Sequence, residues 1–300
     1  MNIRKVRKGI QLFLAFTLVL LISAGCKGNN TTNTPDTTKP PSIPPKSTFV
    51  MDFSDFTDTS SSTMIIPLHP AYSVSLFQEF TAMYPEQNAL GDHSNWTFAA
   101  LNVGFWNIVG ILGLAIPVAS FVESVKQTPV KQPDGSWIWT YSITVSGITY
   151  TAKLQGKYTT GGIRWDMYIS KQGDFTDFLW YYGESDLGGT HGYWLLKEKP
   201  SKPDDLLRID WNRDPASETG DIKYTNISPG GLENGGYISF VVNRQEPYNR
   251  IYTIYNKGRN ETTYIEWNFT TKAGRVKDAG HFNNDEWHYW DSNLKNTTVP

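Results

Sequence analysis

The pattern of apolar and polar positions divides the chain into one long apolar stretch and a series of short alternating ones. The apolar stretch, His93 to Val122, contains no Asp, Glu, Lys or Arg. Projected at about 100° per residue, it leaves no polar stripe, and its amides Asn102 and Asn107 do not share a face. The pattern therefore predicts one long helix over about 95–124, interrupted by Pro117 and buried on all sides.

A membrane span is the alternative for this stretch, since about 20 apolar residues suffice to cross a bilayer. Two features favour burial within protein instead. The amides of Asn102 and Asn107 would lie in hydrocarbon, and no basic cluster marks a cytoplasmic flank. We expect both amides to form hydrogen bonds inside the protein.

From Trp137 onward the apolar residues recur with a period of two. Trp137–Val145 and 148–154 alternate strictly on either side of Ser146-Gly147, a pattern typical of a β-hairpin. Further alternating segments follow at short intervals and predict strands at 163–169, 178–182, 191–196, 206–211, 221–227, 237–243, 251–255, 264–269 and 275–277. The connections are too short for crossover helices, so the sheet is antiparallel.

These elements indicate a mainly β (α+β) protein. We expect a curled antiparallel meander sheet of about ten strands, a barrel or half-barrel, wrapped around the one long apolar helix. The alternative, a two-sheet sandwich, leaves the helix without a place in the core. A single β-rich domain is expected over 49–300, with the buried helix at about 95–124.

The first 26 residues follow the pattern of an export signal. A basic segment (Arg4 to Lys8) precedes an apolar run and the small residues Ser23-Ala24-Gly25, directly before Cys26. This resembles the lipobox of bacterial lipoproteins, with Ser23 where Leu is commonest. The resemblance implies a signal peptide over 1–25, cleavage before Cys26, and acylation of the Cys26 thiol by lipid chains such as palmitate.

The segment after this cysteine, residues 26–48, is rich in Pro and Thr and has no apolar periodicity. It predicts a disordered tether that holds the domain away from the bilayer. We expect the protein in the cell envelope, anchored through Cys26 to a bacterial membrane, the outer rather than the inner. An ordinary signal peptide and a plain membrane anchor are the alternatives.

Composition adds two points. Removal of Arg4, Lys5, Arg7 and Lys8 with the signal peptide leaves 23 basic against 29 acidic residues, a net charge of −6, and no basic stripe is present. Nucleic acid is therefore not an expected partner. Cys26 is the only cysteine, so the folded part contains no disulfide.

Three clusters are candidates for chemistry. The segment Asp210 to Asp221 begins like a calcium-binding loop, but Pro215 stands at the position that requires Gly. The C-terminal segment contains His281, Asp285, Glu286, His288 and Asp291 at spacings that match no metal site. The succession Trp180-Tyr181-Tyr182 puts at least one ring on the face opposite the core, where it could stack on a sugar or a lipid tail. No catalytic, cofactor or metal site is assigned.

The body of the chain resembles uncharacterised β-rich envelope lipoproteins and, in layout only, the half-barrel-plus-helix lipoprotein carriers. That likeness implies non-catalytic binding of an apolar or amphiphilic ligand beside the helix. Two alternatives are a surface lipoprotein that binds glycans through Trp and Tyr, and a hydrolase whose paired carboxylates the sequence does not reveal. We do not expect catalysis.

Overall fold

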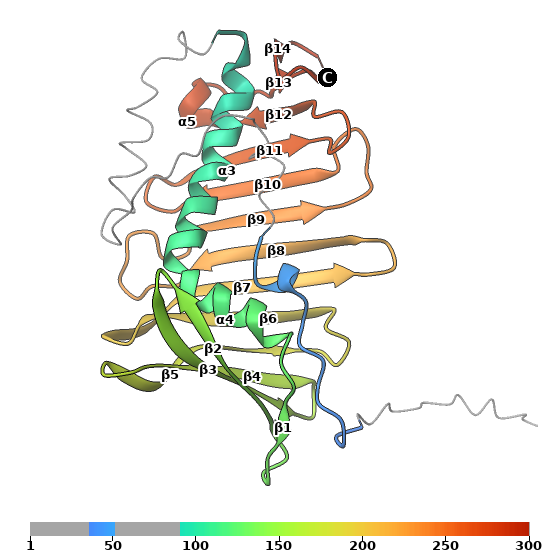
Figure 1. The fold of residues 1–300 in the computed structure, drawn as a ribbon. Helices are drawn as coiled ribbons and strands as arrows, with labels where there is room; N and C mark the ends of the chain where they lie inside the picture. Colours follow the sequence, from blue (N-terminus) through green and yellow to red (C-terminus); the bar gives the residue numbers. More distant parts are fainter. Residues whose placement is uncertain (1–35, 52–90, 300) are drawn as a thin grey trace, which may run out of the picture. The chain divides into compact units, whose positions relative to one another are not determined.

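The computed structural model describes residues 36–51 and 91–299, and for 104–113 the backbone alone (Figure 1). Cys26 and the predicted signal peptide lie outside the described residues. Pro35–Pro300 form one unit by their contacts. Within it, residues 36–48, which the sequence assigns to the tether, include the buried Pro41, Pro44 and Thr48.

One antiparallel sheet dominates the unit. Each of its fourteen strands pairs with the next along the chain, in the order β1 to β14, and the first and last strands do not meet. The predicted meander is therefore confirmed, but a closed barrel and a count of about ten strands are wrong. The strands are β1 (Val130–Lys131), β2 (Trp137–Val145), β3 (Ile148–Tyr158), β4 (Ile163–Lys171), β5 (Phe175–Ser185), β6 (His191–Lys199), β7 (Lys202–Asp214), β8 (Thr219–Asn226), β9 (Tyr237–Val242), β10 (Arg250–Asn256), β11 (Glu261–Trp267), β12 (Gly274–Lys277), β13 (His288–Trp290) and β14 (Asn296–Thr297).

Two helices replace the one that the sequence predicts over about 95–124. They are α3 (Ser94–Gly113) and α4 (Ala115–Ser124), with Leu114 between them at φ −116° and ψ 8°. Pro117 explains the break, because it has no N–H to donate to the carbonyl of Gly113, four residues earlier, and in a continuous helix its ring would clash with that carbonyl. Among the described residues, no helix is long and apolar enough to cross a membrane.

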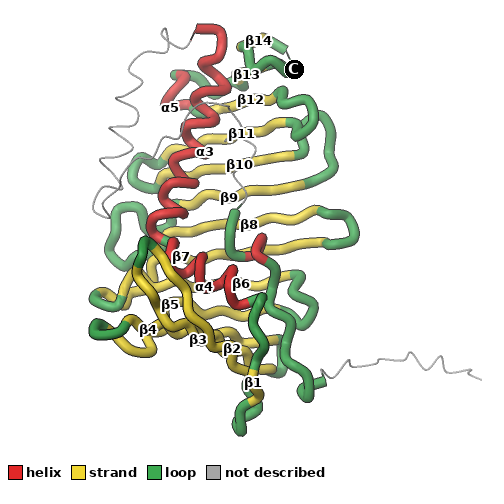
Figure 2. The backbone as a smooth tube through the Cα atoms, in the orientation of Figure 1, coloured by secondary structure: helices red, strands yellow, loops and turns green. Residues whose placement is uncertain are grey.

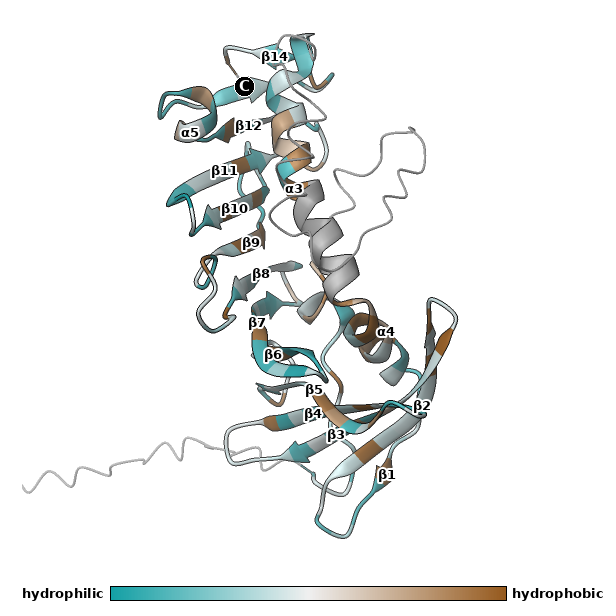
Figure 3. Ribbon diagram, turned by 90° about the vertical axis from the view of Figure 1, so that its left-hand side faces the viewer, coloured by the Kyte–Doolittle hydropathy of each residue, from teal (hydrophilic) through white to brown (hydrophobic). Residues whose placement is uncertain are grey.

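The helices lie over one face of the sheet, here called the inner face (Figure 2). α4 packs mainly on β2, and α3 packs mainly on β12 and β13; Figure 3 shows β2 to β5 bent beneath α4. Asn102, which is buried in α3, donates to the carbonyl of Phe98 at 2.9 Å, as expected for an amide held inside the protein. The side chain of Asn107 lies outside the described residues. The short elements are η1 (Lys46–Thr48), η2 (Gly91–His93) and α5 (Ala279–Phe282).

Tryptophans on the inner face interlock with glycines of neighbouring strands. Trp165 on β4 lies opposite Gly156 on β3 and Gly183 on β5, and Gly183 also lies opposite Trp194 on β6. A Cβ at Gly183 would stand 2.8 Å from the Trp194 ring and 2.0 Å from the Tyr193 carbonyl. The glycines thus provide the space that these indoles occupy, which fixes the position of each ring.

The opposite, outer face carries a pseudo-twofold pattern across β4 to β7. One cross-strand row reads Arg164, Glu184, Tyr193, Asp210, and the adjacent row, in the opposite direction, reads Arg208, Leu195, Tyr182, Asp166. Each guanidinium bonds the aspartate two residues on and covers a tyrosine ring, at 4.7 Å for Arg164 on Tyr182 and 4.5 Å for Arg208 on Tyr193. On this solvent-exposed face each arginine therefore has both a carboxylate to bond and an aromatic ring to cover.

The described segment before the first gap, residues 36–51, forms an arm against the inner face. Its Phe49 is fully buried and stacks on Phe121 of α4, with ring centroids 4.7 Å apart. Tyr224 on β8 donates to the Phe49 carbonyl at 2.9 Å and accepts from the amide of Met51 at 2.7 Å. The arm is therefore bonded to the sheet by its backbone as well as by apolar contact.

Candidate functional site

A groove lies between the end of the arm and the inner face over β7 to β10. Its volume is about 680 Å³, within the range of small-molecule sites. Ser47, Thr48 and Val50 of the arm form one wall. The remaining lining residues come from the sheet and its turns: Trp211, Asn212, Arg213, Asp214, Pro215, Glu218, Thr219, Gly220, Asp221, Ile222, Phe240, Val242, Arg250 and Phe269. We call this the arm groove.

Strand register explains the composition of its floor. Side chains of one strand face alternate sides, so each cross-strand row belongs to one face. One inner row runs from Arg213 through Gly220 and Val242 to Arg250. The next row contributes Trp211, Ile222 and Phe240. The floor is therefore apolar and is lowest at Gly220, which has no side chain, and an arginine stands at each end.

Arg213 differs from three other half-buried arginines of the sheet. Arg164, Arg208 and Arg275 each lie within 2.7 Å of a carboxylate oxygen. Arg213 has no carboxylate within 4.0 Å among the described residues, and its side chain makes a single long hydrogen bond, 3.5 Å, to the Gly189 carbonyl. At the other end of the row, Arg250 lies on the ring of Phe269 at 4.8 Å. Arg213 thus brings a positive charge to the groove that no neighbouring carboxylate pairs.

Three acidic residues lie at the β7–β8 turn, and each has a local partner. Strand alternation puts Asp214 and Asp221 on the outer face with Asn212, so of the three only Glu218, in the turn itself, stands at the rim of the arm groove. Asp214 accepts from the Ser217 hydroxyl at 2.7 Å, Glu218 pairs with Arg244 at 3.5 Å, and Asp221 accepts from the Asn212 amide at 3.3 Å. Hydrogen bonds from Ser217 and from the Ala216 amide hold the pKa of Asp214 below its ordinary value. The groove therefore joins an apolar floor to an arginine at each end of its inner row and to Glu218 at its rim, which Arg244 pairs.

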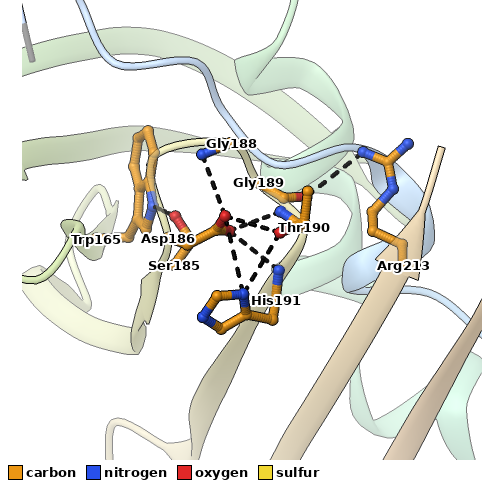
Figure 4. Close-up of polar contacts among 8 residues, drawn as sticks. All are labelled: Trp165, Ser185, Asp186, Gly188, Gly189, Thr190, His191 and Arg213. Atoms are coloured by element: carbon orange, nitrogen blue, oxygen red, sulfur yellow. Dashed lines mark hydrogen bonds and ion pairs between the residues drawn. The ribbon is translucent and has the colours of Figure 1, made fainter. Parts of the chain in front are cut away.

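The β5–β6 turn supports Arg213 and borders a second, smaller cleft of about 270 Å³. Figure 4 shows Asp186 at the centre of this turn, where it accepts from the amides of Thr190 and His191 at 2.6 and 3.0 Å. Burial raises the pKa of Asp186, but these bonds outweigh it and keep the pKa below its ordinary value. Ser185 accepts from the Trp165 indole at 3.0 Å. Asp186 and Ser185 thus organise the turn, and their contacts form no nucleophile–base pair.

The calcium-like segment is a β-hairpin in the structure, not a loop. Asp210 pairs with Arg208 on β7, while Asp221 faces Asn212 across the strand pair. The described residues contain no group of three His, Cys, Asp or Glu placed to hold a metal ion.

The C-terminal cluster is an aromatic stack at the start of α3. His281 lies on Phe98 and His288 on Phe282, each pair with centroids 3.7 Å apart. Asp285, instead of facing the histidines, pairs with Lys277 at 3.2 Å. Burial lowers the pKa of His288, and the nearby Glu286 offsets only part of that effect. Asp291 accepts a hydrogen bond from the Lys295 amide in the next turn. The segment joins α3 to the sheet.

The three successive aromatic residues of β5 divide between the faces through a β-bulge opposite Met167 and Tyr168. Trp180 and Tyr181 are both buried, and Tyr182 is the ring that the outer face receives. Arg164 and Lys197 both lie over the Tyr182 ring, at 4.7 and 5.8 Å from its centroid, and leave less of it open for stacking on a sugar. The arm groove was not visible in the sequence, because the predicted strand at 206–211 ends before Arg213; extending its alternation by two residues would have placed Arg213 on the apolar face.

No protein-family model, no curated protein and no solved structure matches the chain.

Proposed function

We propose that the protein is a lipid-anchored cell-envelope protein that binds an amphiphilic ligand, without chemical change, in the arm groove. The observation that carries the proposal is the arm groove's composition, an apolar floor of Trp211, Ile222, Phe240 and Val242 joined to charged groups at its ends and rim. An alkyl chain on such a floor is removed from water, which contributes about 0.8 kcal/mol per CH₂ group.

The position of the arm groove in the sheet supports this role. The main helix contacts are with β2, β12 and β13, whereas the arm groove lies over β7 to β10. The arm supplies a wall that is itself bonded to Tyr224. A ligand therefore meets a surface that the hydrogen bonds of the sheet and the arm already hold in place.

The anchor is part of the proposal and rests on the sequence around Cys26. An acylated protein incorporates labelled palmitate when cells grow in its presence, and Cys26→Ser abolishes the label. Palmitate label on the Cys26→Ser chain, or none on the wild type, overturns this part. The outer membrane is the expected location.

Glycan binding remains the second candidate, because Glu184, His191 and Tyr193 line the smaller cleft. The outer-face tyrosines favour it less, since guanidinium groups cover them.

The proposal is tested by native mass spectrometry of the full-length protein extracted from membranes in a mild non-ionic detergent. We expect an additional mass of one amphiphile. Val242→Trp fills the floor of the arm groove and removes that mass. The matched control, Val241→Trp, puts the same ring on the outer face of the same strand and keeps the mass. No bound mass in the wild type, or the same mass in both variants, overturns the proposal.

A further inference from the structure

The charges that face the arm groove indicate which head group its ligand carries. In the inner row that forms the floor, the ionisable side chains are Arg213 and Arg250, one at each end. An alkyl chain gains nothing from either, so these charges bear on the polar end of the ligand alone. We infer that the arm groove selects an amphiphile with an anionic head, a carboxylate or a phosphate, and that Arg213 holds this head. The inference names the ligand class of the proposed function and rests on it.

The acidic residues at the β7–β8 turn do not neutralise these arginines. Asp214 and Asp221 lie on the outer face, because successive side chains of a strand alternate between faces. Glu218, at the rim, pairs with Arg244 at 3.5 Å, and its side chain is 83% exposed. The whole sequence has a formal net charge of −2, but salt screens exposed charges that are more than about 8 Å away. The local charge at the floor of the groove is therefore positive.

Arg213 is the arginine that can bond the head group directly. Its side chain is half-buried, has no carboxylate within 4.0 Å among the described residues, and makes one long hydrogen bond, 3.5 Å, to the Gly189 carbonyl (Figure 4). A guanidinium has five N–H donors in a planar fork, so most of those of Arg213 remain for a ligand. The fork matches two oxygens of a carboxylate or a phosphate, and the hydrogen bonds it forms to them are charge-assisted.

Arg250, at the opposite end of the row, is already engaged by neighbouring groups. It donates to the Asn249 carbonyl at 3.0 Å and lies on the ring of Phe269 at 4.8 Å. Three strand spacings separate it from Arg213, roughly 14 Å at about 4.8 Å each. Arg250 therefore adds to the positive potential of the groove, whereas the direct bonds to the head are assigned to Arg213.

The apolar residues beyond Arg213 indicate where the tail lies. From Arg213 the row continues across Gly220, which has no side chain, to the half-buried Val242. Phe269, at the far end of the groove, is 47% exposed. A tail that begins at Arg213 therefore crosses Gly220 and covers apolar surface of Val242 and Phe269 that water otherwise contacts.

The test compares four amphiphiles with the same twelve-carbon tail. Dodecanoate and dodecyl phosphate are anionic, dodecyl maltoside is neutral, and dodecyltrimethylammonium is cationic. Each is titrated below its micelle concentration into the full-length chain with Cys26→Ser, at about pH 8, where carboxylic acids are ionised. Binding is followed by calorimetry. We expect an anionic head to give at least about tenfold tighter binding than the maltoside, the ratio that charge-assisted hydrogen bonds provide.

Free anions separate the head from the tail. Acetate and inorganic phosphate carry the same charged groups without an alkyl chain. They should bind at least about tenfold more weakly than dodecanoate and dodecyl phosphate, because they remove no long apolar chain from water. Inorganic phosphate that binds as tightly as dodecyl phosphate would mean that the site takes a free anion, and this overturns the inference.

Variants of one residue identify the group responsible. Arg213→Gln should reduce the binding of the anionic amphiphiles to about the level of the maltoside and leave maltoside binding unchanged. The matched control, Arg208→Gln, removes the same charge from the outer face of the same strand and keeps the preference for an anionic head. Arg213→Glu should reverse the preference, so that dodecyltrimethylammonium binds more tightly than dodecanoate. Circular dichroism shows that each variant is folded before it is titrated.

The outcomes separate the inference from the proposed function. Maltoside binding as tight as that of both anionic amphiphiles, or an anionic preference that survives Arg213→Gln, overturns the inference and leaves amphiphile binding intact. Tight binding of only one of the two anionic amphiphiles supports the inference and identifies the head group. If none of the four amphiphiles binds to the folded chain, the proposed function fails and the inference fails with it.

Discussion

Tyr224 donates a hydrogen bond of 2.9 Å to the carbonyl of Phe49, from the middle of the sheet to the end of the arm. The same hydroxyl accepts from the amide of Met51 at 2.7 Å, and burial raises the pKa of the phenol far above its ordinary value. One side chain therefore satisfies two backbone groups of the segment that forms the wall of the arm groove.

Tyr224→Phe should lower the free energy of unfolding by about 2 kcal/mol, because both backbone groups lose their partner while remaining buried. The variant should also raise hydrogen exchange at the Met51 amide. Denaturant unfolding and exchange mass spectrometry measure the two effects. Tyr255→Phe, which removes one exposed hydrogen bond to Asn260, serves as control; an equal loss in both variants contradicts the role given to Tyr224.

Gly183→Ala should destabilise the protein by about 3 kcal/mol, the upper end of the usual cost of overpacking. The added Cβ would meet the Tyr193 carbonyl and the Trp194 ring. Gly161→Ala is the matched control, because a Cβ there meets no atom within 4 Å. The midpoint of chemical denaturation compares the two. A loss below about 1 kcal/mol at Gly183 would contradict this, because it would mean that the Tyr193 backbone and the Trp194 ring both move at little cost.

The stability of the α3 end of the sheet should fall as the pH decreases below about 6.5. Burial lowers the pKa of His281 and of His288 from the ordinary value of 6.5, and His288 adds to the effect at His281. The unfolded chain then binds more protons than the folded one in this window. The stabilisation is complete above pH 6.5 and is lost as the pH falls through the lower pKa values of the folded protein.

His281→Phe should reduce this pH dependence while keeping the stack on Phe98, which has ring centroids 3.7 Å apart. Denaturant midpoints between about pH 5 and pH 8 measure the slope. His191→Gln, at an imidazole whose side chain is 65% exposed, is the control. A slope unchanged by His281→Phe would assign the pH dependence to other groups.

The pseudo-twofold pattern of the outer face makes a quantitative prediction. Double-mutant cycles for Arg208 with Tyr193 and for Arg164 with Tyr182 should give similar coupling energies, each about 0.5–1 kcal/mol. The two geometries agree within 0.2 Å. A cycle for Arg208 with Tyr255, three strands away, should show additivity. Coupling in only one of the two pairs would mean that the two halves of the pattern are not energetically equivalent.

Local periodicity predicted the hairpin of β2 and β3. Ser146 and Gly147 both adopt positive φ, 51° and 78°, as the two-residue turn requires. The same alternation could not show whether the sheet closes, because closure depends on strand tilt and stagger rather than on which side chains are apolar. β1 and β14, with two residues each, are too short to give a periodic signal.

The arm groove could not be predicted from the sequence for a different reason. Its wall comes from residues 47–50 and its floor from strands more than 150 residues later. Nothing local in the sequence of the arm indicates that Phe49 enters the core or that Tyr224 bonds its backbone. The strand predicted at 206–211 ends before Arg213, which in the structure continues the inner face of β7.

Photo-crosslinking tests the central claim, that the arm groove holds an amphiphile, most directly. A dodecyl maltoside with a diazirine in its tail is irradiated with the full-length Cys26→Ser chain, and the modified peptides are mapped by mass spectrometry. The label should fall on Phe240, Val242 and Phe269, which line the arm groove. It should decrease in Val242→Trp and persist in Val241→Trp. Labelling confined to the outer face or unchanged by Val242→Trp would contradict the claim.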